Sequence, residues 1–439
     1  MTRPTAETRQ GLTARLRGAA LDLTPLRVSR PYRRLLFGDA VSVLGTQVTA
    51  VAVPLQVYAQ TRSVVAVGLV GVAGLLPLIV FGLYGGAIAD AVDRRRLVLL
   101  TTSGQLLLAL VLIGQAVLDL EQTWLLYAVI ACQAGIFAID SPARQAFVPR
   151  LLSKELLPAA NALKQVEFNL AVTVGPLLAG VLVAQLGYGA AYALDAVTFG
   201  AALLAVSGLP AMPPEGGGRR AGTASVLEGL AFLRSRQVLL MTFVVDLVAM
   251  VFAMPRALFP ALAQDVYGGG EQTAGILYSS LAVGALLGAL FSGWLGRVHR
   301  HGVAVLAAIM VWGASITLFG LADVLWLAVL CLAAAGLADM VSAVFRTAIL
   351  QAAAPDEMRG RLGGVFIVVV AGGPRLGDAR AGAGAELVGL QGSSVAGGLL
   401  VVGITAAVAA GATRFRAYDA REPSPGQLTE TRSARSDDS

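Results

Sequence analysis

The stretch G-G-A-I-A-D-A-V-D-R-R-R at residues 85–96 follows a long apolar run and changes abruptly to charge. Its small residues let the end of a helix approach a neighbour closely, and its three arginines resist entry into a lipid bilayer. This change predicts a membrane-spanning helix that ends in a short polar turn, on the side of the membrane that collects positive charge.

The composition of the whole chain points to the same class of protein. Of 439 residues, 56% are apolar and 14% are charged, and the mean hydropathy is +0.73. Soluble domains are about half apolar and about a quarter charged. Since a bilayer core requires roughly 20 apolar residues per helix, the chain has room for about a dozen spans. We therefore predict an all-α integral membrane protein.

Twelve apolar segments of sufficient length can be placed along the chain. They cover residues 35–59, 64–89, 97–117, 123–142, 158–186, 189–208, 237–261, 272–296, 302–321, 324–345, 362–387 and 393–412. Most of the 33 Lys and Arg residues fall in the termini and loops of one side, so the positive-inside rule places both termini in the cytoplasm. The net charge of +6 then reflects topology and attraction to the lipid bilayer, and we expect no nucleic-acid partner.

A polar interruption rich in Gly and Pro divides the spans into six and six. It begins L-P-A-M-P-P-E-G-G-G-R-R at residue 209, a composition that does not remain helical in lipid. We expect a cytoplasmic tail at 1–34, six-helix bundles at 35–208 and 237–412, a cytoplasmic linker at 209–236 and a disordered cytoplasmic tail at 413–439. Two such halves are typical of transporters that rock about a midplane site.

The opening stretch resembles the loop between spans 2 and 3 of major facilitator superfamily transporters, where a Gly-x-x-x-Asp step precedes a basic cluster. Here the step runs from Gly86 to Asp90, with Arg94 and Arg95 behind it, and Asp93 stands where the family pattern usually has a glycine. The second half has Arg297 in the place of the acid. We expect Asp90 to pair with a span of the C-terminal half and to hold the outward-open state.

Span 5 contains A-V-T-V-G-P-L-L-A-G at residues 171–180, which is similar to the signature of antiporting members of the superfamily. Gly175, Pro176 and Gly180 match that signature, whereas Ala171 and Ala179 replace two of its glycines. Small residues permit close helix approach and a proline bends a helix, so the halves are expected to flex here. An ordinary packing face is the alternative.

Further segments narrow the resemblance to the enterobactin-exporter-like branch, which overlaps with macrolide-efflux-like drug:proton antiporters. These segments are A-V-P-L-Q at 52–56, D-S-P-A-R-Q-A-F-V-P-R-L at 140–151, R-A-L-F-P-A-L-A at 256–263 and L-Q-A-A-A-P-D-E-M-R-G-R-L at 350–362. The resemblance implies a monomeric inner-membrane protein that exports a siderophore or drug-like natural product by alternating access, in exchange for protons. An importer on the same fold and a non-transporting sensor or scaffold remain alternatives.

Charged residues inside spans are candidates for function, because a charge at the bilayer centre costs about 2.5–3.5 kcal/mol. Asp246 and Asp339, near the middle of spans 7 and 10, are candidates for proton coupling, as are Asp39 and Glu167. Structural hydrogen bonds are the alternative for the aspartates. For Glu167, one helical turn from Lys164, the alternative is an ion pair within the helix.

A polar face of span 1 and charged residues of spans 7 and 11 are candidates for the wall of a substrate cavity. The candidates there are Thr46, Gln47, Arg256, Arg375 and Asp378. Hydrogen bonding between helices is the alternative for span 1, and a break at Pro374 is the alternative for span 11.

Enzyme chemistry has little support in the sequence. His299 and His301 lie in a basic loop without a ligand partner at metal-binding spacing, and Cys132 and Cys331 lie in separate spans without a CxxC pattern. There is no phosphate-binding Gly-x-x-x-x-Gly-Lys loop. We predict no catalytic residue, no metal and no cofactor.

Overall fold

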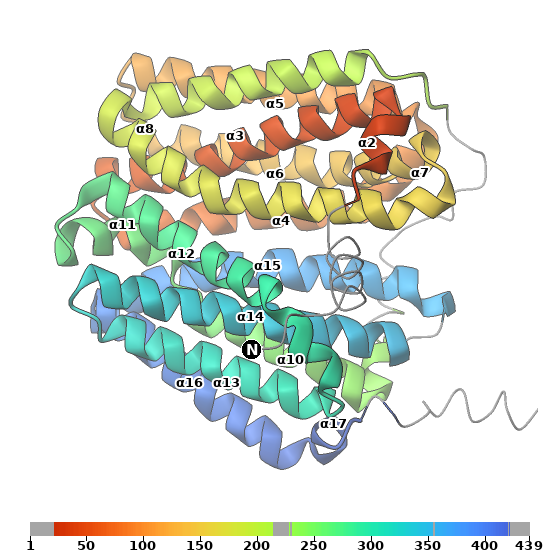
Figure 1. The fold of residues 1–439 in the computed structure, drawn as a ribbon. Coiled ribbons are helices and arrows are strands. Elements are labelled where there is room, and N and C mark those ends of the chain that lie inside the picture. Colours follow the sequence, from red (N-terminus) through yellow and green to blue (C-terminus); the bar gives the residue numbers. More distant parts are fainter. Residues whose placement is uncertain (1–21, 214–227, 229–230, 354–355, 420, 422–439) are drawn as a thin grey trace, which may run out of the picture.

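The structure is a computed structural model that describes residues 22–213, 228, 231–353, 356–419 and 421. Within these ranges the regular elements are helices, and they form two bundles side by side (Figure 1). The chain enters the first long helix and leaves the last one at the same end of the bundles, which we call the inner end. The opposite end is called the outer end.

The N-terminal half consists of five long helices preceded by the short α2 (Thr24–Val28). They are α3 (Arg30–Thr61), α4 (Val64–Ala91), α5 (Arg94–Val117), α6 (Thr123–Gln145) and α8 (Leu157–Ser207), with the short α7 (Val148–Leu151) before α8. Helix α8 reverses direction at Gly187, whose φ of +80° favours glycine. It therefore provides two spans, which brings this half to six.

The C-terminal half also has six long helices. They are α10 (Gln237–Ala253), α12 (Gly270–Leu290), α13 (His301–Gly320), α14 (Leu325–Ala353), α15 (Asp356–Val388) and α16 (Leu390–Gly411). Short turns of helix, η2 (Arg256–Leu258), α11 (Phe259–Ala261) and the π-helical η3 (Leu262–Val266), join α10 to α12.

Ten helical segments in the described ranges are long and apolar enough to cross a membrane. Lys154–Ser207 is one of them but contains two spans. Helix α15 is not among the ten, because part of it lies outside the described side chains, but its 33 residues are long enough to cross a membrane. The prediction of an all-α protein with twelve membrane helices in two six-helix bundles is confirmed.

Several predicted boundaries were wrong, for local reasons. Helix α10 ends at Ala253 rather than 261, because Met254 is extended before Pro255. Helix α14 continues to Ala353, beyond the predicted end at 345. The tail expected to be disordered from 413 begins with α17 (Thr413–Arg416), whose Phe415 is fully buried. At the other end, α3 begins at Arg30 instead of 35, after Ser29 caps it by accepting from the N–H of Tyr32.

The two halves touch along α8 with α12 and along α4 with α15 (Figure 1). Ser279 of α12 donates to the carbonyl of Thr173 of α8 at 2.9 Å, near the middle of both helices. At the outer end, Tyr58 of α3 donates to Asp265 at 2.6 Å and Arg62 donates to Gln264 at 2.7 Å. These contacts hold the two halves together from the middle of the molecule to its outer end.

The turn between α4 and α5 is tied to the end of α8. Asp93 accepts from the N–H of Arg96 at 2.9 Å, which caps α5, and its second oxygen accepts from the N–H of Met212 at 2.9 Å. Arg95 donates to the carbonyl of Ser207 at 2.5 Å. The aspartate that departs from the family pattern thus fastens the beginning of the predicted linker to the N-terminal half.

Replacing Asp93 by Ala is expected to destabilise the protein by about 1–2 kcal/mol, because an N-cap is worth about 0.5–2 kcal/mol and the Met212 N–H loses its acceptor. The midpoint of thermal unfolding measures the loss. Asp93→Asn retains an acceptor and should lose less. Glu121→Ala, which removes an exposed acid from another loop, is the control, and an equal loss in that variant would contradict the capping role.

Candidate functional site: two charge clusters and the contact between the halves

A cluster of charged side chains lies on the inner side of the N-terminal half. The guanidinium of Arg144 (α6) contacts Asp39 of α3 at 2.6 Å and also pairs with Asp140, one turn earlier in α6. Lys164 of α8 approaches the second oxygen of Asp39 at 3.2 Å. The cluster therefore joins three helices of one bundle, and we call it the N-cluster.

Threonines of α5 and one further acid complete the N-cluster. Thr101 donates to Asp140 at 2.5 Å, and Arg144 donates to Thr102 at 2.7 Å. Glu167, one turn after Lys164, has a buried carboxylate oxygen without a hydrogen-bond partner. Lys164 forms its ion pair with Asp39 and not with Glu167, so the alternative of an ion pair within the helix does not hold. The N-cluster holds three acids and two cations.

A second cluster, the C-cluster, lies on the inner side of the C-terminal half. Arg346 of α14 pairs with Asp246 of α10, and its other terminal nitrogen is 3.7 Å from Asp339. The side chain of Asp246 is 5% exposed, whereas that of Asp339 is 39% exposed. Two acids thus share one arginine, and Asp339 is the more exposed of the two.

The two clusters occupy equivalent positions in the two halves. Asp39 and Asp246 each lie nine residues after the first residue of their helices, α3 and α10. Arg144 and Arg346 each lie 21 residues after the first residue of α6 and α14. The first and fourth long helices of each half therefore carry the same aspartate–arginine pair, as expected of a fold built from two repeated halves.

Arg346 was not among the residues singled out from the sequence, because span 10 was predicted to end at 345. The apolar pattern V-S-A-V-F-R-T-A-I-L at residues 341–350 continues past this arginine. That continuation of the apolar pattern was the signal by which the sequence could have identified Arg346.

The polar face of α3 is used mainly for contacts within the N-terminal half. Thr49 donates to Asp195 at 2.6 Å, and the amide of Gln56 exchanges hydrogen bonds with Gln115 of α5 at 3.1 and 2.9 Å. Thr46 donates to the carbonyl of Ser42 in its own helix. Thr49 and Gln56 thus form hydrogen bonds between helices. This is the alternative to a cavity wall that the sequence left open for span 1.

Gln47 and the predicted antiporter signature meet where α3 packs on α8. A Cβ added to Gly175 would come within 2.5 Å of the Cβ of Gln47. On the other side of α8, a Cβ on Gly180 would lie 2.7 Å from the carbonyl of Glu271 and 3.2 Å from the Cα of Gly275. One on Gly275 would lie 2.6 Å from the carbonyl of Pro176. The small residues thus allow backbone contact between the halves.

Charged residues of α15 lie at the other contact between the halves. A Cβ on Gly71 of α4 would meet the carbonyl of Arg375 at 2.9 Å and the Cβ of Asp378 at 3.3 Å. Arg375 and Asp378 each have one buried polar atom without a hydrogen-bond partner. Arg256 lies near Asp378 and its own side chain is exposed. Arg380 points away and donates to the carbonyl of Ser393 in α16 at 3.0 Å.

Two residues of the opening motif are only partly described. Gly86 and Asp90 lie within α4, but their side chains are outside the described part of the structure, so the predicted pairing of Asp90 stays a prediction. Their neighbours Arg94 and Arg95 form backbone and side-chain bonds to residues 207–212 of their own half.

Known proteins resemble this chain over most of its length. The profile of the transmembrane secretion effector family matches residues 20–433. The enterobactin exporter EntS of Citrobacter koseri is 31% identical over 390 residues, which cover 88% of this chain and 92% of the relative. EntS of Shigella boydii is 32% identical over 394 residues, with the same coverage of both chains.

Solved structures agree on the fold at much lower identity. The nucleoside transporter NupG has a TM-score of 0.70 at 12% identity, covering 89% of this chain and all of its own. A bacterial homologue of the iron transporter ferroportin, in an inward-facing state, has a TM-score of 0.61 at 17% identity, covering 86% of this chain and 98% of its own. The protein is a multi-pass membrane transporter and not an enzyme, and it belongs to the transmembrane secretion effector family of the major facilitator superfamily.

Proposed function

We propose that this protein exports a siderophore or a comparable amphipathic natural product from the cytoplasm, by alternating access and in exchange for protons. The observation that carries the proposal is the position of the charge clusters. Both lie on the inner side, while the contacts between the halves run from the middle of the molecule to its outer end. An opening toward the inner end would let a substrate and protons reach the clusters from that side.

The orientation follows from the distribution of positive charge, which favours the cytoplasm for both termini. The inner end then faces the cytoplasm of a bacterial inner membrane. Close relatives carry the name of enterobactin exporters, and this supports a substrate of that general class. Arg256, Arg375 and Asp378, at the contact between α4 and α15, are proposed to meet the polar groups of the substrate.

The four proton-coupling candidates fall into two pairs according to the charges around them. Asp39 and Asp246 are held by Arg144 and Arg346 and serve as their counter-ions. Each cluster has one acid more than it has cations, and one proton restores its neutrality. Glu167, with an unpartnered oxygen, and Asp339, the most exposed acid of its cluster, are the groups proposed to carry that proton.

Replacing Glu167 by Gln or Asp339 by Asn is expected to uncouple export from the proton gradient. Each variant keeps its shape but loses the proton of its own cluster, so gradient-driven accumulation in inverted vesicles should fall by about 5–150-fold, for a typical coupling energy of about 1–3 kcal/mol. Inverted vesicles with an acid interior, to which enterobactin is added on the outside as the test substrate, provide the measurement.

Exchange of labelled for unlabelled substrate without a gradient should persist in both variants, because it requires no net proton movement. Glu386→Gln, at an exposed acid of the outer end, is the matched control. Gradient-driven export at the wild-type rate in both variants would remove these acids from coupling. Accumulation on the opposite side of the membrane would instead establish an importer.

A further inference from the structure

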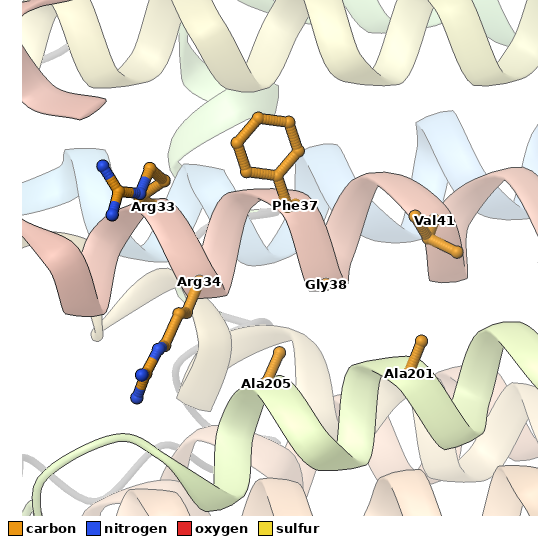
Figure 2. A pocket seen from close by; sticks show the side chains of 7 residues that line it. All are labelled: Arg33, Arg34, Phe37, Gly38, Val41, Ala201 and Ala205. Atoms are coloured by element: carbon orange, nitrogen blue, oxygen red, sulfur yellow. The ribbon is translucent and has the colours of Figure 1, made fainter. Parts of the chain in front are cut away.

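A groove on the outside of the N-terminal half combines apolar walls with two arginines at one end. It has a volume of about 390 Å³ and lies between α3 and the last part of α8 (Figure 2). Its lining residues are Arg33, Arg34, Phe37, Gly38, Val41, Ala201 and Ala205. This volume lies within the range of about 300–1,000 Å³ that is usual for small-molecule sites.

Small residues create the groove where the two helices cross. A Cβ added to Gly38 would come within 2.5 Å of the Cβ of Ala205 and 3.6 Å of the Cα of Ala202. The backbones are therefore close, and Ala201 and Ala205, one turn apart, leave a shallow channel above the crossing (Figure 2). Phe37 is 60% exposed and Val41 is 41% exposed, so the channel offers its apolar wall to the surroundings.

The arginines stand at the inner end of this channel. Both are exposed, and in the described part of the structure neither guanidinium forms a hydrogen bond or an ion pair. Arg34 extends along α8 toward Gly208, where an added Cβ would come within 2.8 Å of its Nη1 (Figure 2). From Arg33 to Val41 the helix rises about 12 Å. The lining of the groove therefore changes from charged to apolar over this distance, which is similar to the distance between the headgroup of a phospholipid and its acyl chains.

We propose that this groove binds an anionic phospholipid, with its phosphate between Arg33 and Arg34 and one acyl chain over Gly38 toward Val41 and Ala201. The arginines supply positive charge that no counter-ion from the described residues balances, and the floor supplies apolar contact in the direction of the bilayer core. Assignment to the cytoplasmic leaflet rests on the orientation proposed above. Basic pockets between membrane helices on the cytoplasmic side are suited to such headgroups.

Native mass spectrometry of the full chain, purified in detergent with added phosphatidylglycerol or phosphatidylcholine, tests the proposal. We expect the wild-type protein to retain phosphatidylglycerol in preference to phosphatidylcholine. The double variant Arg33→Gln/Arg34→Gln should lose affinity for phosphatidylglycerol by about thirtyfold, since each basic residue near an anionic lipid surface is worth about 1 kcal/mol.

A matched control separates this site from general charge attraction. Arg297→Gln/Arg300→Gln removes two exposed arginines from an inner loop of the other half and should retain phosphatidylglycerol as the wild type does. Ala201→Leu fills the channel without changing charge and should weaken retention of the same lipid. Unchanged retention in Arg33→Gln/Arg34→Gln, an equal loss in the control, or equal binding of both lipids by the wild type would each overturn the proposal.

The measurement uses neither substrate nor proton gradient, so its result is independent of the proposed transport activity. A protein that failed to export enterobactin would still show the difference between the lipids if the groove binds as proposed.

Discussion

Replacing Arg346 by Gln is expected to destabilise the protein more than any other single change considered for the charge clusters. It leaves Asp246, with a side chain only 5% exposed, without a cation inside the bundle. Removing one partner of a buried ion pair costs about 3–5 kcal/mol. We expect a large fall in the yield of folded protein and in the midpoint of thermal unfolding, with transport abolished.

A second variant distinguishes lost charge balance from lost packing. In Asp246→Asn/Arg346→Gln both members of the pair become neutral amides of similar size, so much of the stability should return while transport remains absent. Arg300→Gln, at an exposed arginine of an inner loop, is the control and should unfold like the wild type. Wild-type stability in Arg346→Gln would show that Asp246 does not depend on this arginine.

Replacing Gly275 by Leu is expected to prevent closure of the outer end. At this position an added Cβ already meets the carbonyl of Pro176 at 2.6 Å and the Cα of Gly180 at 3.2 Å. Both neighbours are backbone atoms of the opposite half, so the clash is relieved only when α8 and α12 separate. We expect transport to stop and the conformational equilibrium to shift toward separation at this contact.

Cross-linking measures that shift. Cysteines at Thr173 and Ser279, whose side-chain-to-carbonyl bond joins the same two helices, are introduced in a chain with Cys132→Ser and Cys331→Ala. A short bifunctional reagent should join them readily in this background and poorly when Gly275→Leu is added. Gly200→Leu is the control, because a Cβ at Gly200 meets no atom within 4 Å. Equal cross-linking with and without Gly275→Leu would contradict the closure role.

The fold was largely predictable because its determinants are local. Apolar segments of span length and the Gly- and Pro-rich interruption after residue 209 indicate twelve helices in two halves, whatever their exact packing. The ends of helices were harder to predict. Arg346 was placed in a loop because a charge normally ends a span, whereas here Asp246 of another helix neutralises it inside the bundle.

The partners of the site residues depend on tertiary structure that sequence spacing does not contain. Glu167 follows Lys164 at the spacing of a helical ion pair, yet Asp39, more than a hundred residues away, takes the lysine. The polar face of α3 could likewise be interpreted as a cavity wall or as a set of hydrogen bonds between helices, because its partners depend on tertiary structure. Whether Thr49 faces a cavity or Asp195 is decided by the rotation of α3 against α8, which helical periodicity alone does not fix.

The single excess acid in each cluster has an energetic consequence for export. If each cluster takes up one proton per cycle and the exported molecule is neutral, two positive charges cross the bilayer inward. Each charge gains about 2.3 kcal/mol from a membrane potential of 100 mV. Two charges would then supply about 4.6 kcal/mol, enough to sustain a concentration ratio of about three orders of magnitude. Voltage alone, without any difference in pH, should therefore drive this transporter.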